Sequence, residues 1–351
     1  MAQLLDTLAR PIVQAPMAGG PSTPRLAAAV SGAGGLGFLA AGYRMADDLA
    51  EEIAATRALT PRFGVNVFVP GPPSERGAVD GYVASLAAEA GRYGVAVGEA
   101  RHSDDDWGAK LALLAGDPVP VVSFTFGCPP PEAIGRLREA GSEVWVTVTD
   151  VEEGHTALAA GADALVVQGA EAGAHQGAFE DRPEREPLGL LALLQLARAE
   201  LEAPLVASGG IATGAGVAAV LAAGASAAQL GTAFLLCPEA GTSDAHRAGL
   251  EAGGETRFTR AFTGRRARGI VNRFLREHEG APVAYPEIHY ATAPIRAAAR
   301  AAGDADGLNL WAGQAHALAR PEPAADVVAR LDAEARDALA AARGRLGPAQ
   351  A

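Results

Sequence analysis

Residues 205–234 read LVASGGIATGAGVAAVLAAGASAAQLGTAF, and this order of apolar and small residues decides the fold. A short apolar run from Leu205 to Ser208 leads into a glycine-rich loop and an alanine-rich stretch from Ala215 to Ala222. A second apolar run then extends from Ala228 to Phe234. Apolar runs that alternate with helical stretches are typical of parallel strands covered by helices on both faces. The stretch therefore predicts a βαβ unit.

The same alternation recurs along most of the chain. Apolar runs occur eight times, over Ile12 to Ala15, Leu36 to Ala40, Phe63 to Val69, Val119 to Phe126, Val144 to Thr149, Ala164 to Gln168, Leu205 to Ser208 and Ala228 to Phe234. Length does not decide the fold, because 351 residues suit about two average domains or one enlarged barrel. Eight strand–helix units favour a (β/α)8 TIM barrel over a doubly wound sheet of about five or six strands.

The junctions between helices and strands repeat as well. Four similar glycine-containing segments each follow an alanine-rich helix and precede an apolar run, at residues 31–34, 140–142, 160–163 and 223–226. Glycine just past a helix end adopts the left-handed conformation that stops the helix. We therefore expect four copies of one helix-to-strand turn.

Two regions break this rhythm. Residues 71–118 are too long for one crossover and contain the acidic run Ser103 to Asp106, so we expect a helical insertion after the third strand, with these charges on a solvated face or at a helix cap. From about Gly254 the strands are expected to stop, and an arginine-rich segment leads into helical sequence. The predicted organisation is a barrel over residues 1–253 and a segment over residues 254–351 that caps or flanks it.

Charge and composition exclude several classes of protein. The chain has 29 Lys+Arg against 41 Asp+Glu and a net charge of −12, whereas a nucleic-acid partner requires a basic surface. Lys110 is the single lysine and lies between Ala109 and Leu111, so a Walker A loop, which requires Gly-Lys-Ser/Thr, is excluded. A Schiff-base enzyme would depend on this one residue.

The cysteine count and the hydropathy pattern indicate the compartment. Cys128 and Cys237 are too few for a disulfide framework or a thiolate metal site, and no HExxH motif occurs. The first ten residues lack the apolar core of a signal peptide, and no run reaches the ~18 apolar residues of a membrane span. We expect a cytoplasmic protein without a metal or a membrane segment.

Two glycine-rich segments could bind an anion, and their contexts differ. Residues 32–37 match GxGxxG but leave a helix and enter a strand, the reverse of a dinucleotide-binding loop, so close packing is the favoured interpretation. Residues 207–214 leave a strand and open a helix, which presents backbone N–H groups to an anion. Together with residues 229–232, they follow the seventh and eighth predicted strands, where barrels often bind phosphate. We expect a phosphate-bearing ligand there.

His175 is the candidate catalytic side chain. It follows the sixth predicted strand, among small residues that would admit a ligand, and an ordinary imidazole pKa near 6.5 suits a general base. A structural role satisfied by a backbone partner remains the alternative. His155 and His246 lie in predicted helices, where a structural role is favoured. Seven arginines form a basic patch for which a surface or subunit contact is expected, namely Arg257, Arg260, Arg265, Arg266, Arg268, Arg273 and Arg276.

Taken together, these motifs resemble the nitronate monooxygenase family, formerly called 2-nitropropane dioxygenases. The resemblance extends from about residue 8 to residue 320 and rests on residues 11–18, 64–68, 168–177, 208–211 and 229–232. Residues 264–269 and 310–314 resemble its class I branch. Relatives with other activities share this barrel.

The resemblance implies non-covalently bound FMN and assigns residues to it. Met17 would approach the isoalloxazine ring, Asn66 and Gln168 would hydrogen-bond it, and Gly173 would leave room for it. The phosphate would be held by Gly210, Gln229, Leu230, Gly231 and Thr232. His175 would remove the α-proton of a neutral nitroalkane or position an anionic nitronate. The implied reaction is oxidation of the nitronate by O2 to a carbonyl compound plus nitrite or nitrate, without a nicotinamide.

The chain departs from the family pattern beside the expected base and in one strand. Ala174 and Gln176 flank the histidine where the family usually has glycine and arginine, and Thr125 stands where class I members commonly have a second histidine. These departures concern substrate handling, for which His289 or Tyr290 are further candidates. The alternatives are an NAD(P)H-dependent flavin reductase of the enoyl-thioester type and a non-catalytic scaffold, and a homodimer is one assembly to be tested.

Overall fold

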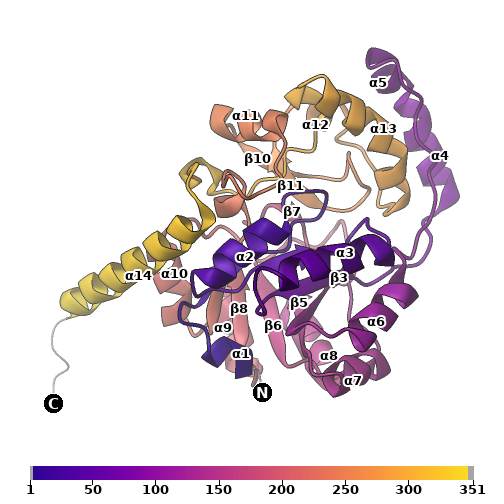
Figure 1. Cartoon of the computed structure of the whole chain (residues 1–351). Helices are drawn as coiled ribbons and strands as arrows, with labels where there is room; N and C mark the ends of the chain where they lie inside the picture. Colours follow the sequence, from indigo (N-terminus) through magenta and orange to yellow (C-terminus); the bar gives the residue numbers. More distant parts are fainter. Residues whose placement is uncertain (1–2, 347–351) are drawn as a thin grey trace.

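The computed structural model describes residues 3–346 and shows an eight-stranded parallel barrel with helices on its outside (Figure 1). The strand order is β1-β9-β8-β6-β5-β4-β3-β2. The ring closes where Leu36, just before β2, forms a parallel bridge with Val13 of β1. There the N–H of Gln14 donates to the carbonyl of Leu36 at 2.9 Å. The prediction of a (β/α)8 barrel is therefore confirmed.

The barrel strands lie close to the eight apolar runs. Their bounds are β1 Ile12–Gln14, β2 Phe38–Ala40, β3 Gly64–Phe68, β4 Val121–Thr125, β5 Glu143–Val148, β6 Ala164–Gln168, β8 Leu205–Ser208 and β9 Ala227–Leu230. The last run was expected to remain a strand to Phe234, but it ends at Leu230. Thr232–Phe234 form a short 3-10 helix, η1, directly after Gly231.

One helix packs outside the barrel after each strand. These helices are α2 Pro24–Gly32, α3 Ala46–Arg57, α6 Trp107–Gly116, α7 Pro131–Glu139, α8 Val151–Ala159, α9 Leu190–Glu200, α10 Gly214–Ala222 and α14 Ala324–Leu346. A short helix, α1 (Gln3–Asp6), places Leu5 against buried residues at the amino ends of the strands. Such an arrangement leaves the carboxyl ends of the strands free to build a site.

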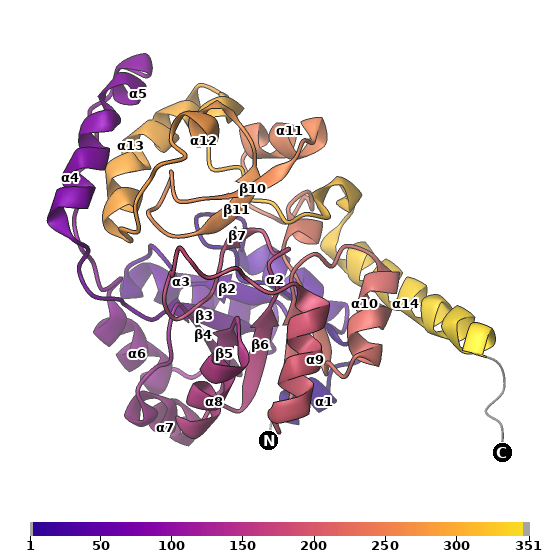
Figure 2. The same ribbon diagram turned by 180° about the vertical axis from the view of Figure 1, so that it is seen from behind.

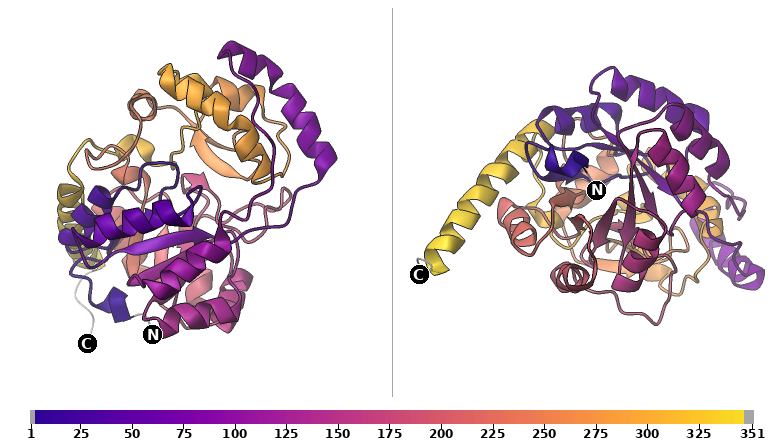
Figure 3. Two further views of the ribbon diagram at one scale, coloured as in Figure 1. Left: turned by 45° about the vertical axis from the view of Figure 1, so that its right-hand side comes forward. Right: turned by 90° about the horizontal axis from the view of Figure 1, so that it is seen from below.

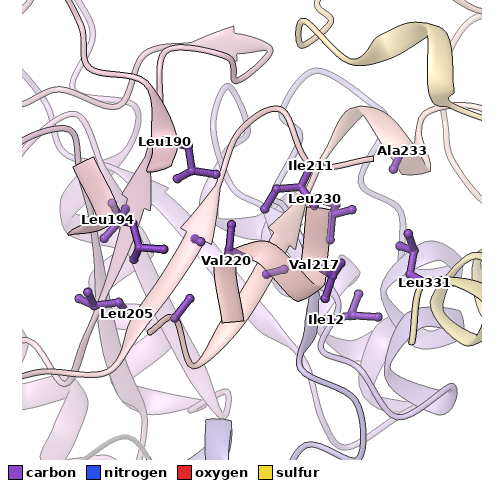
Figure 4. Packing of buried hydrophobic residues seen from close by; sticks show 14 of the residues in the cluster. Ile12, Leu190, Leu194, Leu205, Ile211, Val217, Val220, Leu230, Ala233 and Leu331 are labelled. Atoms are coloured by element: carbon purple, nitrogen blue, oxygen red, sulfur yellow. The ribbon is translucent and has the colours of Figure 1, made fainter. Parts of the chain in front are cut away.

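The alanine-rich composition permits this close packing of helices on strands. The largest core cluster joins Leu194 of α9, Val217 of α10 and Leu331 of α14 to the strand residues Ile12 and Leu205 (Figure 4). All five side chains are at most 1% exposed. Burial of apolar surface on this scale is the main favourable term in folding.

The predicted helix-to-strand turns are confirmed. Gly34, Gly141, Gly161 and Gly224 all have positive φ, between 90° and 105°. The packing interpretation of residues 32–37 is also supported, because a Cβ on Gly37 would lie 2.2 Å from the carbonyl oxygen of Ala27 in α2.

A second lobe covers the carboxyl ends of the strands. It contains the three-stranded sheet β10-β11-β7 and several helices, and the expectation that strands stop near Gly254 is wrong. Its elements are β7 Ala174–His175, α11 Asp244–Ala252, β10 Thr256–Thr259, β11 Ala267–Ile270, α12 Arg273–Glu277, α13 Glu287–Ala301, η2 Ala305–Gly307 and η3 His316–Leu318. The sequence did not predict β10 and β11 because arginines interrupt the apolar pattern of these two strands.

The expected insertion after β3 divides between the two lobes. Helices α4 (Arg76–Ser85) and α5 (Ala87–Arg92) pack beside α13, as the left view of Figure 3 shows, whereas α6 packs on the barrel. Within the acidic run, Asp106 binds the N–H of Ala46 at the start of α3, so the helix-cap alternative applies to this residue. The solvated-face alternative fails for Asp105, which pairs with fully buried Lys110.

Helix α14 belongs to the barrel wall although it follows the second lobe in the chain. It lies between α10 and α2 and contributes Val327, Val328 and Leu331 to the core (Figures 1 and 2). We propose a division in which residues 324–346 join the barrel and residues 76–92 join the second lobe, in place of a single boundary at residue 253.

Candidate functional site

One cavity of about 350 Å³ lies where the second lobe meets the carboxyl ends of the barrel strands. Its walls come from the carboxyl ends of β3, β4, β5 and β6, from loops after β1, β2, β4, β6, β8 and β9, and from α13. The cavity is lined by all but one of the residues predicted for the site, namely Met17, Asn66, Thr125, Gln168, Gly173, His175, Gly210, Gln229, Leu230, Gly231 and Thr232. Tyr290 is the exception, because its ring packs against Arg101 at 3.9 Å while its neighbour His289 lines the cavity.

Backbone amides after β8 and β9 form one end of the cavity. Gly209 and Gly210 have φ values of +117° and +68°, which turn the chain sharply after Ser208. Within residues 3–346, the N–H groups of Gly209, Gly210 and Gly231 find no protein acceptor. Thr232 adds a hydroxyl, which accepts the N–H of Gly313 at 3.0 Å. This amide cup, formed by residues 209–210 and 231–232, has the donors that a phosphate group requires.

The start of α10, the helix that follows the amide cup, offers fewer free N–H donors to an anion than the sequence indicated. At the start of α10, the N–H of Gly214 donates to Glu334 of α14 at 2.8 Å, and that of Gly216 donates to Thr213 at 3.2 Å. These helix-terminal donors are therefore already satisfied by side chains. The free donors lie upstream, in the strand-to-helix loop itself.

Polar side chains in the barrel mouth are fixed by one another. The amide nitrogen of Asn66 donates to the hydroxyls of Ser123 at 2.9 Å and Thr125 at 3.0 Å, which directs the Asn66 carboxamide across adjacent strands. Thr125 also contacts the hydroxyl of Thr147 at 3.3 Å. These contacts hold the Asn66 carboxamide in one orientation beside the cavity.

Gln168 braces the loop that carries His175. Its amide nitrogen donates to the carbonyl of His175 at 3.1 Å, and its amide oxygen accepts the N–H of Gly177 at 2.7 Å. Gly173 in the same loop packs against the second lobe, since an added Cβ would lie 2.5 Å from the nitrogen of Gly313. Glycine is thus required at position 173 by protein packing, whatever ligand the cavity holds.

The His175 ring is held between the two lobes. Its backbone pairs with Ala267 of β11, and its Nε2 contacts the hydroxyl of Thr263 at 2.8 Å. Rings of Phe126, Tyr285 and Trp311 surround it, with centroids 5.4–5.7 Å apart where they meet. Because Nε2 is engaged by Thr263, Nδ1 is the ring nitrogen left to meet a ligand.

The surroundings of His175 keep its imidazole neutral. Burial away from water and, to a smaller extent, the positive charges of Arg265 and Arg296 together lower its pKa from 6.5 to about 3, against a weaker opposing effect of Asp181. The imidazole is therefore a proton acceptor throughout the ordinary pH range. The sequence-based expectation of an unperturbed value near 6.5 is not met.

The cavity is electropositive although the protein is acidic. Among the described residues that line it there is no Asp or Glu, whereas Arg296 and Arg300 both reach it. Arg296 is 8% exposed and is anchored by Thr292 and by the carbonyl of His289. Burial lowers its pKa to about 10, so it keeps its charge at neutral pH. An anionic ligand suits this lining.

The predicted arginine patch is not a uniform surface patch, because Arg268 is buried and four others are partly buried, whereas Arg257 and Arg276 are exposed. Arg268 is 6% exposed and donates to the carbonyl of Ala170 at 2.9 Å. Arg265 lies over the Phe126 ring at 4.1 Å. Arg260 forms two hydrogen bonds with Asp181, of 2.6 and 2.8 Å. These arginines fasten the second lobe onto the loop after β6.

Sequence reasoning missed several residues that line or support the cavity. Tyr43 follows β2, and the rule that strand ends carry site residues could have found it. Thr263 and Arg296 lie outside the barrel strands, and only the fold brings them to the cavity. For His246, the expected structural role is supported by a contact between its Nε2 and the Trp311 carbonyl at 3.0 Å.

Across residues 3–346, no three His, Cys, Asp or Glu side chains are grouped as metal ligands would be. No described helix combines the length and the apolar character that crossing a bilayer requires.

Known proteins of one family resemble the chain along almost its whole length. The family model described as nitronate monooxygenase matches residues 2–334. A nitronate monooxygenase of Paraburkholderia phytofirmans is 42% identical over 94% of this chain and 93% of its own length. One of Pseudomonas aeruginosa is 42% identical over 93% and 96%. Among solved structures, a nitroalkane oxidase from Streptomyces ansochromogenes has a TM-score of 0.95 and 54% identity over 97% of this chain and 100% of that one. FabK of Thermotoga maritima has a TM-score of 0.76 and 27% identity over 98% of both chains.

Proposed function

Because this chain belongs to the nitronate monooxygenase family, and is thus an oxidoreductase, we propose that it oxidises alkyl nitronates with FMN and O2. The products would be a carbonyl compound and nitrite or nitrate, and no nicotinamide is needed. The observation that carries the proposal is the electropositive cavity, with free backbone amides at one end and a neutral histidine among aromatic rings.

The cavity fits FMN at its amide cup. A Cβ on Gly231 would lie 3.5 Å from that of Ala15 and 3.8 Å from the sulfur of Met17, which places Gly231 beside the loop after β1. We assign Gly209, Gly210, Gly231 and Thr232 to the phosphate, and Asn66 and Met17 to the ring system. Lys110 is not among the lining residues, so backbone amides and one hydroxyl would hold the phosphate without a lysine. FMN bound there would accept electrons from the substrate and pass them to O2.

His175 would act as a proton acceptor or as a positioning group, depending on the substrate. A base is most effective when its pKa lies near the working pH, and a value of about 3 lies well below it. Proton removal from a neutral nitroalkane is therefore disfavoured, whereas a nitronate has already lost that proton. We infer that the anionic nitronate is the better substrate, and that Arg296 supplies a positive charge for it.

The test is a visible spectrum of the purified protein before and after anaerobic addition of propionate 3-nitronate. We expect a yellow protein whose flavin is reduced or semi-reduced by the nitronate and reoxidised by air. A flavin spectrum that the nitronate leaves unchanged would refute the proposal, and a colourless protein that does not take up FMN would favour a scaffold role.

The likeness to FabK motivates a second candidate, an NAD(P)H-dependent flavin reductase of the enoyl-thioester type. The same anaerobic sample distinguishes the two. Rapid bleaching by NADH or NADPH, with no response to nitronate, would favour the reductase. The lower identity, 27% against 54% for the nitroalkane oxidase, is why nitronate oxidation is preferred.

A further inference from the structure

The single lysine of the chain lies behind the wall of the cavity. Lys110, in the first turn of α6, is fully buried, and its ammonium lies 2.8 Å from a carboxylate oxygen of Asp105. Within residues 3–346 it has no other ion-pair partner. The attraction within a buried ion pair offsets the free energy of removing both charges from water only in part, so stabilisation alone does not explain the Lys110–Asp105 pair.

The other oxygen of Asp105 holds the loop that carries Tyr43. It accepts the Tyr43 N–H at 2.9 Å, and the adjacent Asp106 accepts the N–H of Ala46 at 2.8 Å. Tyr43, Asp105 and Asp106 all have positive φ, of 66°, 56° and 57°. Non-glycine residues keep this conformation only where their surroundings impose it, and such residues cluster at functional sites.

Tyr43 in turn forms part of the cavity wall. Its ring stacks flat on that of His289, with centroids 3.8 Å apart and planes at 5°. Its hydroxyl accepts a hydrogen bond from Tyr285 at 3.1 Å, and Tyr285 lies against His175. Tyr43 and His289 both line the cavity. A shift of the Tyr43 backbone would therefore move the surface that faces the ligand.

We propose that Lys110 and Asp105 are positioning residues that fix Tyr43 and thereby set which alkyl chains the site accepts. The ammonium holds the Asp105 carboxylate in place, and that carboxylate holds the Tyr43 N–H in its left-handed turn. The effect on alkyl chains rests on the proposed nitronate oxidation, whereas the effect on the Tyr43 backbone does not.

The first arm of the test measures amide hydrogen exchange in residues 41–46 of the full chain. Asp105→Leu removes the acceptor and should speed exchange at Tyr43 by ~10-fold or more, and Lys110→Met should do the same to a smaller extent. Asp105→Asn keeps an acceptor oxygen for the Tyr43 N–H but turns an amide NH2 toward the Lys110 ammonium, so its exchange rate should lie between those of wild type and Asp105→Leu. Unchanged exchange in both Asp105→Leu and Lys110→Met would overturn the proposal, whether or not the protein oxidises nitronates.

The second arm measures kcat/KM for a short and a long alkyl nitronate. In Lys110→Met we expect the ratio of the two values to change by ~5-fold or more, because a displaced wall alters the space for the chain. Arg57→Met is the control, since Arg57 and Asp117 form a half-exposed pair, also at 2.8 Å, and neither residue lines the cavity. A ratio within twofold of wild type in Lys110→Met would overturn the role in selectivity, even if the melting temperature falls.

A fallback keeps the test decisive if Lys110→Met does not fold. The double variant Lys110→Met/Asp105→Asn leaves no unpaired buried charge, which is the costly state for a broken ion pair. It keeps the oxygen acceptor but loses the ammonium that orients it, so faster exchange at Tyr43 supports the proposal and wild-type exchange refutes it. If wild-type protein leaves nitronates unoxidised, the proposed function fails and the exchange arm alone decides the positioning role.

Discussion

Replacing Arg296 by methionine tests the electrostatic account of the candidate base. Two causes depress the pKa of His175 to about 3: burial, which is the larger, and the charges of Arg265 and Arg296. Removing one cation must raise that pKa, because a nearby positive charge disfavours imidazolium. We expect a value above about 3 and below 6.5, since burial persists in Arg296→Met.

The size of the effect follows from the protonated fraction at pH 6. A pKa of about 3 leaves roughly one His175 in a thousand protonated, whereas an unperturbed imidazole would be about three-quarters protonated. Wild-type kcat/KM for a nitronate should therefore show no break near pH 6.5 that arises from His175. Arg296→Met should move any acid limb of the profile toward neutral pH and raise KM for anionic substrates.

The assay is carbon-13 NMR of histidine ring carbons, with the His175 signal assigned by its loss in His175→Gln. Arg300→Met is the matched control, because Arg300 also lines the cavity but is exposed and acts on the pKa of His246 instead. A wild-type His175 signal that titrates near pH 6.5 would refute the reasoning. So would an Arg296→Met signal that titrates no higher than in wild type.

Three other predictions concern catalysis, the amide cup and acid stability. His175→Ala should retain FMN but lose ~100-fold or more in nitroalkane turnover, with a smaller loss of nitronate turnover. Steady-state rates with both substrates measure this, and full nitroalkane activity would contradict the prediction. Gly210→Ala should weaken FMN binding, because φ is +68° and the new Cβ would lie 2.8 Å from that of Glu171. Flavin fluorescence measures this binding. The control variant Gly216→Ala meets only ordinary contacts and should bind FMN as wild type does. The free energy of unfolding should fall as pH drops from about 6.5 toward 4. In the folded protein the pKa values of His175 and His246 are lowered to about 3 and about 4, so over this pH range the two side chains take up protons mainly when the chain is unfolded. Urea titrations should show a smaller loss of stability in His246→Gln.

The barrel could be predicted because its signals are local. Each strand is an apolar run bounded by a helix and a turn, and glycines such as Gly141 and Gly224 mark the turns by a backbone requirement that few other residues meet. The second lobe gave no such signal. Its strand Ala267–Ile270 contains Arg268, whose buried guanidinium finds its partner at Ala170, about a hundred residues earlier.

In the candidate site, too, residues at strand ends could be predicted from the sequence, whereas effects that depend on the second lobe could not. Gly210 and Thr232 follow strand ends, so their place at the mouth of a barrel could be inferred from the order of the elements. The lowered pKa of His175 could not, because its causes are burial and two arginines that approach from the second lobe. Likewise, the link from Lys110 to Tyr43 joins residues 67 positions apart through an acidic residue whose sequence context indicated a solvated face or a helix cap.

The position of α14 has a consequence for how the protein is made. The ribosome completes residues 244–320 before it delivers the helix that lies between α10 and α2. Until then, the apolar surfaces that Val327 and Leu331 will cover remain open on the nascent chain. Closure of the wall must therefore wait for synthesis of the whole second lobe, and those exposed surfaces are where chaperone binding or aggregation would begin.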